Sequence, residues 1–441
     1  MSIKLRGTRN RRSYADYKPA SRRQGSRNDP FRIIFYLVVI AGAGWVLLNA
    51  DALRAKLPPL PGQGSLADSG VHLGPPSTPT PQPDQLAGLA LEAYKAGNLD
   101  KAIDLYTQAG EFAPDSVEYH FQVARLLLFE SALQTGSTHD ATLQKALDAS
   151  NQVILADPEK PDGYAIYGKI LDWQGHPDLA LPQIQRALNL DKSYALGNSY
   201  LSEVLVDLQR WDQAQTAIDA ARSAEPNNPD ILRDYGYFLE SQQDYAGAAK
   251  QYQASLAAEP NQPYVKLALA RIYRATQQYN EALDQLFAVD TLSPKTALVE
   301  YEIGVTYESG IGDPTSAQKY YEQATQSDPN FALPWIRLGT IHFAQNSFQQ
   351  AIPDFEEALK LGVSDSVKPR ILVDLALAYA NQGRCDQARA NLEQAAPLVT
   401  PDQTDLTTKI EQANKQCPPL TPSPTLRPGQ KPPATATPIP G

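Results

Sequence analysis

Small side chains, nearly all alanine, recur along the middle of this chain at an almost constant spacing. The gaps between successive members are 44, 34, 34, 34, 34, 35, 34 and 37 residues. We call these positions the alanine series: Ala102, Ala146, Ala180, Ala214, Ala248, Ala282, Ala317, Ala351 and Ala388. A period in this range predicts a repeat architecture, in which each repeat is one small unit that packs on its neighbours.

Bulky residues follow most of the alanine series by four positions, which places both on one face of a helix. They are Tyr106, Ile184, Ile218, Tyr252, Leu286, Tyr321, Phe355 and Leu392. A second series of small residues precedes the first by twelve positions in most repeats, and the seventh repeat has one extra residue: Ala90, Ala124, Gly168, Ser202, Gly236, Ala270, Gly304, Gly339 and Ala376. Small side chains let helices approach closely, so the pattern predicts two crossing helices in each repeat.

Proline and glycine mark the ends of the predicted helices. Prolines that end a helix or shape the turn to the next unit stand at Pro114, Pro158, Pro226, Pro260, Pro294 and Pro329. Glycines that mark the turn inside a unit stand at Gly97, Gly175, Gly312 and Gly383. Residues 310–313 have a G-x-G spacing but precede a repeat helix, so they predict a turn and no nucleotide site. The second repeat carries about ten extra residues around 134–140, which predict a longer turn or a longer first helix.

The best-preserved unit resembles the tetratricopeptide repeat (TPR) family. It contains Trp335-Ile336-Arg337-Leu338-Gly339, followed by Phe348, Ala351, Phe355 and Ala358. The resemblance covers about residues 83–400 in nine units. It implies an all-α fold in which each repeat is two antiparallel helices and the repeats stack into a right-handed superhelix with a concave groove. A short helix at about 402–415 is expected to follow and to cap the apolar end of the stack.

An apolar segment near the N-terminus predicts a single membrane-spanning helix. Residues 33–48 carry no charged side chain, and the 20 residues of 31–50 are long enough to cross a hydrocarbon core of ~30 Å. Residues 1–32 hold ten Lys and Arg against two acidic residues, whereas the whole chain has a net charge of −10. Because basic flanks stay in the cytoplasm, we expect the acidic body on the other side. A signal peptide cleaved near Ala52 is the alternative.

These observations predict five segments. Residues 1–30 form a basic cytoplasmic segment, 31–50 a transmembrane signal anchor, and 51–83 a linker rich in Pro, Gly and Ser. Residues 84–416 form the repeat solenoid with its capping helix. Residues 417–441 form a disordered tail rich in Pro and Thr, whose composition would also allow O-glycosylation.

The side chains that usually carry chemistry do not gather in any known pattern. The five histidines lie without metal-ligand spacing at His72, His120, His139, His176 and His342, and two cysteines are too few for a zinc site. The chain has no H-E-x-x-H, no phosphate-binding loop and no nucleophile elbow. We therefore expect no metal, no cofactor and no enzymatic activity.

The resemblance implies a partner-binding groove lined by the first helices of repeats five to eight. The positions that face this groove in the family correspond to Arg233, Tyr237, Tyr264, Arg271, Arg274, Tyr301, Ile336 and Phe343. Aromatic and Arg side chains are typical anchors of binding surfaces, and two arginines one turn apart could hold a carboxylate or an acidic segment. The alternative, that these are ordinary solvated or packing residues, stays open.

Two cysteines, Cys385 and Cys417, suggest a disulfide. The first lies just before the second helix of the last repeat, and the other lies just after the capping helix. If these helices are antiparallel, the start of one neighbours the end of the other. The Cα atoms of the two cysteines could then lie roughly 4.4–6.8 Å apart, as a disulfide requires. Two unrelated thiols are the alternative.

The sequence therefore predicts a non-catalytic, membrane-tethered scaffold whose extracytoplasmic repeats bind a peptide or protein. The predicted location is the cell membrane, in a single pass with a cytoplasmic N-terminus. An accessory subunit of an envelope enzyme such as a glycosyltransferase, or a cytoplasmic TPR regulator, are the alternative functions. The basic segment has little aromatic interleaving, which does not favour nucleic acid as a partner. Nothing in the sequence indicates the oligomeric state.

Overall fold

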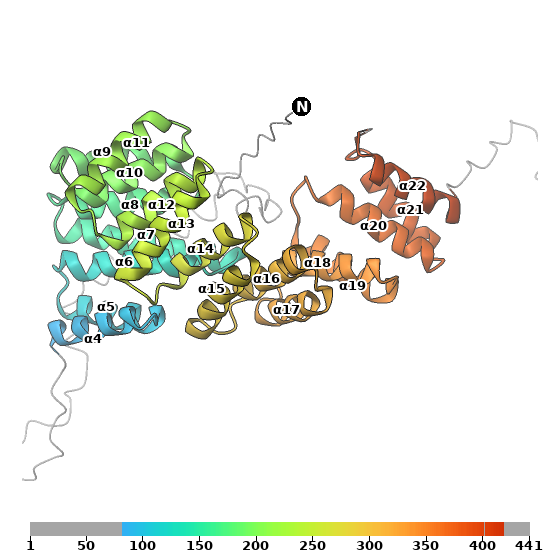
Figure 1. The fold of residues 1–441 in the computed structure, drawn as a ribbon, viewed down its shortest axis with the longest axis horizontal. Coiled ribbons are helices and arrows are strands. Elements are labelled where there is room, and N and C mark those ends of the chain that lie inside the picture. The colour runs from blue at the N-terminus through green and yellow to red at the C-terminus, as the bar shows by residue number, and fades with distance from the viewer. Residues whose placement is uncertain (1–81, 401, 419–441) are drawn as a thin grey trace, which may run out of the picture. The chain divides into compact units, whose positions relative to one another are not determined.

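A computed structural model describes residues 82–400 and 402–418. The predicted basic segment, the spanning segment 31–50, the linker as far as residue 81 and the tail from residue 419 lie outside the described residues. Every regular element that is described is a helix (Figure 1). Among these residues, no helix combines the length and the apolar character needed to cross a membrane.

The helices form nine consecutive antiparallel pairs, followed by one more helix. Each pair is one unit, and the second helix of a unit packs against the first helix of the next. The first helices are α4 (Pro83–Lys95), α6 (Val117–Ser131), α8 (Pro161–Trp173), α10 (Ala195–Asp207), α12 (Pro229–Ser241), α14 (Pro263–Ala275), α16 (Ala297–Thr306), α18 (Ala332–Ala344) and α20 (Lys368–Asn381). The second helices are α5 (Leu99–Phe112), α7 (Gly136–Ala156), α9 (Pro177–Leu190), α11 (Trp211–Ala224), α13 (Tyr245–Ala258), α15 (Tyr279–Leu292), α17 (Pro314–Ser327), α19 (Phe348–Leu361) and α21 (Cys385–Ala395).

The alanine series lies at the crossing of the two helices in each unit. All nine members have 0 % of their surface exposed, as the spacing predicts. The second small series opposes the bulky residues directly: a Cβ atom added at Gly236, Gly304 or Gly339 would lie 2.5–2.6 Å from an atom of the aromatic ring that packs there. Real Cβ contacts are never so short, so these glycines are needed to let the ring lie flat against the helix backbone.

The turn inside a unit requires a left-handed backbone conformation in eight of the nine units. The residue with positive φ is a glycine in four of them, Gly97, Gly175, Gly312 and Gly383, which confirms the prediction made for these positions. In the other four it is Gln209, Gln243, Gln277 or Asn346. A residue with a Cβ atom is strained in this conformation, which favours glycine. Because these four residues are not glycines, the glycine pattern did not predict their turns.

Two units depart from the regular pattern. Most of the extra residues of the second unit lengthen its second helix, α7, which has 21 residues and begins at Gly136. The first helix, α6, has 15 residues, so the predicted longer first helix accounts for only a small part of the insertion. In the seventh unit, α16 continues as the π-helix η1 (Tyr307–Ile311), so residues 310–311 are helical and the turn begins only at Gly312. A π-helix accommodates one more residue per turn, which accounts for the extra residue in this unit.

The helix α22 (Thr404–Gln416) follows the ninth unit at the predicted position. Its buried residues Leu406 and Ala413 pack in clusters with residues of α20 and α21, including Leu372 and Ala395. This helix therefore covers an apolar face to which no further repeat is attached in the described residues. The Sγ atoms of Cys385 and Cys417 lie 1.99 Å apart as a disulfide, with the two Cα atoms 5.1 Å apart, and join the start of α21 to the end of α22.

Candidate functional site

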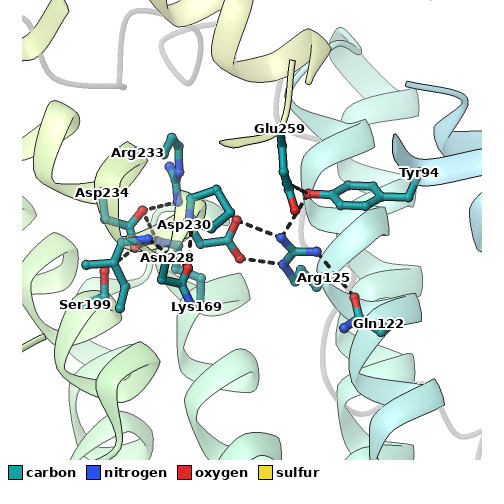
Figure 2. Close-up of polar contacts among 12 residues, drawn as sticks. Tyr94, Gln122, Arg125, Lys169, Ser199, Asn228, Asp230, Arg233, Asp234 and Glu259 are labelled. Carbon is teal, nitrogen blue, oxygen red and sulfur yellow. Dashed lines mark hydrogen bonds and ion pairs between the residues drawn. The ribbon is translucent and has the colours of Figure 1, made fainter. Parts of the chain in front are cut away.

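The first helices of the third, fourth and fifth units meet around a buried group of charges. The ammonium group of Lys169 on α8 forms ion pairs with Glu203 on α10 and Asp234 on α12 (Figure 2 shows the Asp234 side of the group). The hydroxyl of Ser199 also donates a hydrogen bond to Asp234, over 2.8 Å. Arg233 pairs with both carboxylates. Apart from the Arg233–Asp234 pair, which lies within α12, these contacts join the first helices of different units, so the group helps to fix how units three to five are turned relative to one another.

A second charged pair joins units that are distant in sequence. Arg125 on α6 donates two hydrogen bonds to Asp230 at the start of α12, with distances of 2.5 Å and 2.8 Å (Figure 2). The same guanidinium donates to the hydroxyl of Tyr94 over 3.0 Å, and that hydroxyl donates to Glu259 over 2.6 Å. The second unit is thereby tied to the fifth, and the first unit is tied to the residue that follows α13.

Apolar contacts accompany this pair. The rings of Phe129 on α6 and Tyr264 on α14 are stacked with their centroids 4.0 Å apart. The Arg125 guanidinium lies 4.8 Å from the centroid of the Phe129 ring, within the range of a cation–π interaction. Residues of the first two units belong to the same apolar core as those of units five to eight. The chain therefore packs its first two units onto the fifth and sixth.

Burial and charge act in opposite directions on these groups. Burial alone would lower the pKa of Arg125, but the Asp230 carboxylate outweighs this effect and raises it well above its ordinary value. Burial would raise the pKa of Asp234, but Arg233 and Lys169 together hold it below its ordinary value. Both groups are therefore charged at neutral pH. Removing one partner of such a pair typically costs ~3–5 kcal/mol, because the other charge is left buried and unpaired.

Three of the eight predicted groove residues are buried. Arg233 lies in the ion-pair group described above and Tyr264 in the stack with Phe129. Tyr301 packs edge-on against Phe331, with ring centroids 5.3 Å apart. These three side chains expose 5–8 % of their surface, which leaves a partner little of them to contact. Their role in partner binding stays a prediction.

The other five predicted groove residues are half-buried. Tyr237 donates a hydrogen bond to Asp207 of the preceding unit over 2.6 Å. Arg274 pairs with the buried Glu302, and Arg271 lies one turn earlier on the same helix, α14. Ile336 and Phe343 lie on α18 and pack against the core of the eighth and ninth units. The structure thus places Arg271 and Arg274 together and Ile336 and Phe343 together, on the inner helices of the sixth and eighth units.

The repeat spacing did not predict the charges that join the units, namely Arg125, Lys169, Asp230 and Asp234. One signal was present: Lys169 stands between Gly168 and Ile170 on a strongly apolar helix, where a charge requires a buried partner. The described residues contain no group of three or more His, Cys, Asp or Glu side chains that could hold a metal ion.

Comparison with known proteins identifies the repeats. Two family models match, and both are described as tetratricopeptide repeat. The first matches residues 194–263 and 305–366, and the second matches residues 239–300. The DnaJ homolog subfamily C member 7 homolog of Dictyostelium discoideum is 21 % identical over 226 residues, which are 48 % of this chain and 42 % of the relative. The peroxisomal targeting signal receptor of Candida albicans is 25 % identical over 194 residues, which are 43 % of this chain and 30 % of the receptor.

The chain therefore spans less than half the length of these curated relatives. Among solved structures, the APC/C hetero-tetramer Cut9–Hcn1 matches with 12 % identity and a TM-score of 0.49, over 75 % of this chain and 76 % of that one. The periodic helix pairs, the buried alanine series and the family models agree on one assignment. The repeats within residues 194–300 and 305–366 are therefore tetratricopeptide repeats.

Proposed function

We propose that this protein is a non-catalytic, membrane-tethered scaffold that binds a peptide or protein on the inner face of its extracytoplasmic repeats. The repeat fold and the TPR relatives support a protein-interaction scaffold. One relative is named as a receptor for a targeting signal, which is consistent with recognition of a peptide by such repeats. The membrane tether is supported by the uncharged run 33–48 and by the basic segment that precedes it.

One observation carries the choice of binding surface. The first two units contact the fifth and sixth through Arg125–Asp230 and Phe129–Tyr264, whereas three arginines of the sixth and eighth units keep part of their side chains exposed. They are Arg271, Arg274 and Arg337. Arg274 pairs with Glu302 and Arg337 with Glu308, and Arg271 lies one turn from Arg274 on the same helix. Guanidinium groups that keep part of their surface exposed can donate hydrogen bonds to carboxylates, so this face suits a partner segment that carries carboxylates.

Paired substitutions test this surface. Arg271→Ala with Arg274→Ala should weaken binding of the partner about tenfold or more, because a hydrogen bond to a charged group contributes ~1.5–3 kcal/mol. A matched control, Lys145→Ala with Lys250→Ala, removes the same charge from exposed positions on the second helices α7 and α13. Helicity at 25 °C should stay that of the parent protein in both. The Arg274 substitution should lower the melting temperature, because it leaves the buried Glu302 without its partner, so binding is measured well below the melting transition. Equal binding by both variants would place the partner on another surface.

A topology measurement tests the membrane tether separately. A reporter that is active only in the cytoplasm, fused after Gly441, should be silent, because the basic flank retains the N-terminus inside. An active reporter would favour the alternative of a cytoplasmic TPR regulator. Fusion of the same reporter before Met1 is the matched control and should be active.

A further inference from the structure

A small cleft lies beside the Arg125–Asp230 pair. It has a volume of about 240 Å³ and is formed by α4, α6, the starts of α10 and α12 and the residue after α13. Its walls combine apolar and polar side chains, among them Leu91, Phe121, Leu196, Tyr94, Asp230 and Glu259. Sites for small molecules usually have volumes of ~300–1,000 Å³, so the size of this cleft fits one side chain better than a cofactor.

We propose that this cleft binds a lysine or arginine side chain of a partner peptide, with Glu259 as the carboxylate that receives its charge. The inference rests on the proposed peptide-binding function but concerns a second site, which is distinct from the arginines of units six to eight.

The charges of the cleft favour a cation. Arg125 is already engaged by both oxygens of Asp230, so this pair is neutral in sum. Glu259 adds one further negative charge, and it accepts a hydrogen bond from Tyr94 through Oε2 (Figure 2). A carboxylate can accept further hydrogen bonds, and a lysine ammonium or arginine guanidinium has several to donate. An anionic or neutral polar side chain would leave the net negative charge of the cleft unmatched.

The apolar walls favour a long aliphatic stem. Leu91 exposes 42 % of its surface although it lies at the cleft, and Leu196 is half-buried there. The methylene groups of a lysine or arginine can cover such surface while the charged end reaches a carboxylate, which a short polar side chain cannot do. Burying this leucine surface on binding is favourable through the hydrophobic effect.

The charge of the surrounding protein supports the same partner. Residues 82–418 contain 25 Lys and Arg against 45 Asp and Glu, a net charge of −20. Such a body attracts basic segments at long range and accelerates their association, an effect that weakens with rising salt. The occupant is therefore a basic peptide segment of another protein, and its binding should weaken as the ionic strength increases.

Short peptides with one variable residue test the proposal on the full-length protein in detergent. The probes are trifluoroacetyl-Ala-Leu-X-Leu-Ala-amides, in which X is lysine, arginine, norleucine or glutamate, and binding is followed by fluorine NMR of the peptide. The lysine and arginine peptides should bind at least about tenfold more tightly than the norleucine peptide, a factor that corresponds to ~1.4 kcal/mol. Norleucine keeps the aliphatic stem, so equal binding of norleucine and lysine would overturn the assignment of a cation site.

The variant Glu259→Gln isolates the charge. Its amide oxygen can still accept the hydrogen bond from Tyr94, so the fold around the cleft is retained. It should bind the lysine peptide about tenfold more weakly, whereas Glu281→Gln, an exposed position on α15, should bind as the parent does. Equal affinity of Glu259→Gln and the parent would refute the role of Glu259, and lysine peptides that never bind would refute the site.

The failure of this inference is distinguishable from the failure of the proposed function. Arg271→Ala with Arg274→Ala should leave the lysine peptide unaffected, because these arginines do not line the cleft. If that variant loses its natural partner while no peptide binds at the cleft, the scaffold function stands and the cleft assignment alone is wrong.

Discussion

Gly339 provides the most direct test of the packing that defines each unit. A Cβ atom at this position would lie 2.6 Å from Cδ1 and Cε1 of Phe355, a ring that is 1 % exposed and cannot move into solvent. Overpacking of this kind costs ~1–3 kcal/mol, while replacing glycine by alanine inside a helix returns ~1 kcal/mol through its higher helix propensity. Gly339→Ala should therefore destabilise the protein by ~1 kcal/mol, measured as the change in free energy of unfolding in urea.

Gly88 is the matched control, because it also lies inside a first helix but has no atom within 4 Å of an added Cβ. Gly88→Ala should stabilise by ~0.4–1 kcal/mol, since it gains helix propensity without a clash. The two substitutions should thus differ by ~2 kcal/mol although their chemistry is identical. Combining Gly339→Ala with Phe355→Leu should recover part of the clash energy. A Gly339→Ala protein as stable as the Gly88→Ala protein would refute the close helix crossing.

Three further predictions concern the charges and the disulfide. Arg125→Ala should lower the free energy of unfolding by ~3–5 kcal/mol in urea titration, because it leaves Asp230 buried without its partner; Arg125→Met with Asp230→Leu should recover most of this loss, and an additive loss would contradict the pairing. Burial raises the pKa of Glu300, so its carboxylate binds a proton more readily in the folded state than in the unfolded chain. The charged carboxylate therefore destabilises the fold at neutral pH, and this destabilisation disappears as the pH falls through the raised pKa. Glu300→Gln should therefore melt at a higher temperature than the parent at pH 7, and the difference in melting temperature should be smaller at pH 5. A difference that grows as the pH falls would contradict a raised pKa of Glu300. Replacing both Cys385 and Cys417 by serine should destabilise by ~3–4 kcal/mol in the chain-entropy model, for a bridge that spans 32 residues, and free thiols in the mature parent protein would refute the bridge.

The repeats could be predicted from sequence because their packing is local and periodic. Each small residue opposes a bulky one inside the same unit, as Gly304 opposes Tyr321, so the spacing alone reveals both helices. The extra residue of the seventh unit was visible for the same reason, although its accommodation in a π-helix at Tyr307–Ile311 was not. Helix boundaries in the second unit were missed, since α7 begins at Gly136 without a side-chain cap that would mark its start.

The candidate site could be predicted only in part, because it depends on contacts between distant units. Arg125 and Asp230 are 105 residues apart, and Tyr94 and Glu259 are 165 apart. The rotation from one unit to the next accumulates along a stack, so a small change per unit decides which units meet. Repeat positions placed Arg233 on the inner face, but in the structure it is buried and pairs with Glu203 of the preceding unit. No local pattern contains that information.

Photo-crosslinking from defined positions tests the central claim, that a partner binds the inner face of units six to eight, most directly. A photoreactive amino acid placed at Ile336 should crosslink one partner, which mass spectrometry identifies, and the same amino acid at the exposed Ala220 on α11 should not capture it. The crosslink from position 336 should disappear when Arg271 and Arg274 are replaced by alanine. Capture of that partner from position 220, or an undiminished crosslink without the two arginines, would contradict the account.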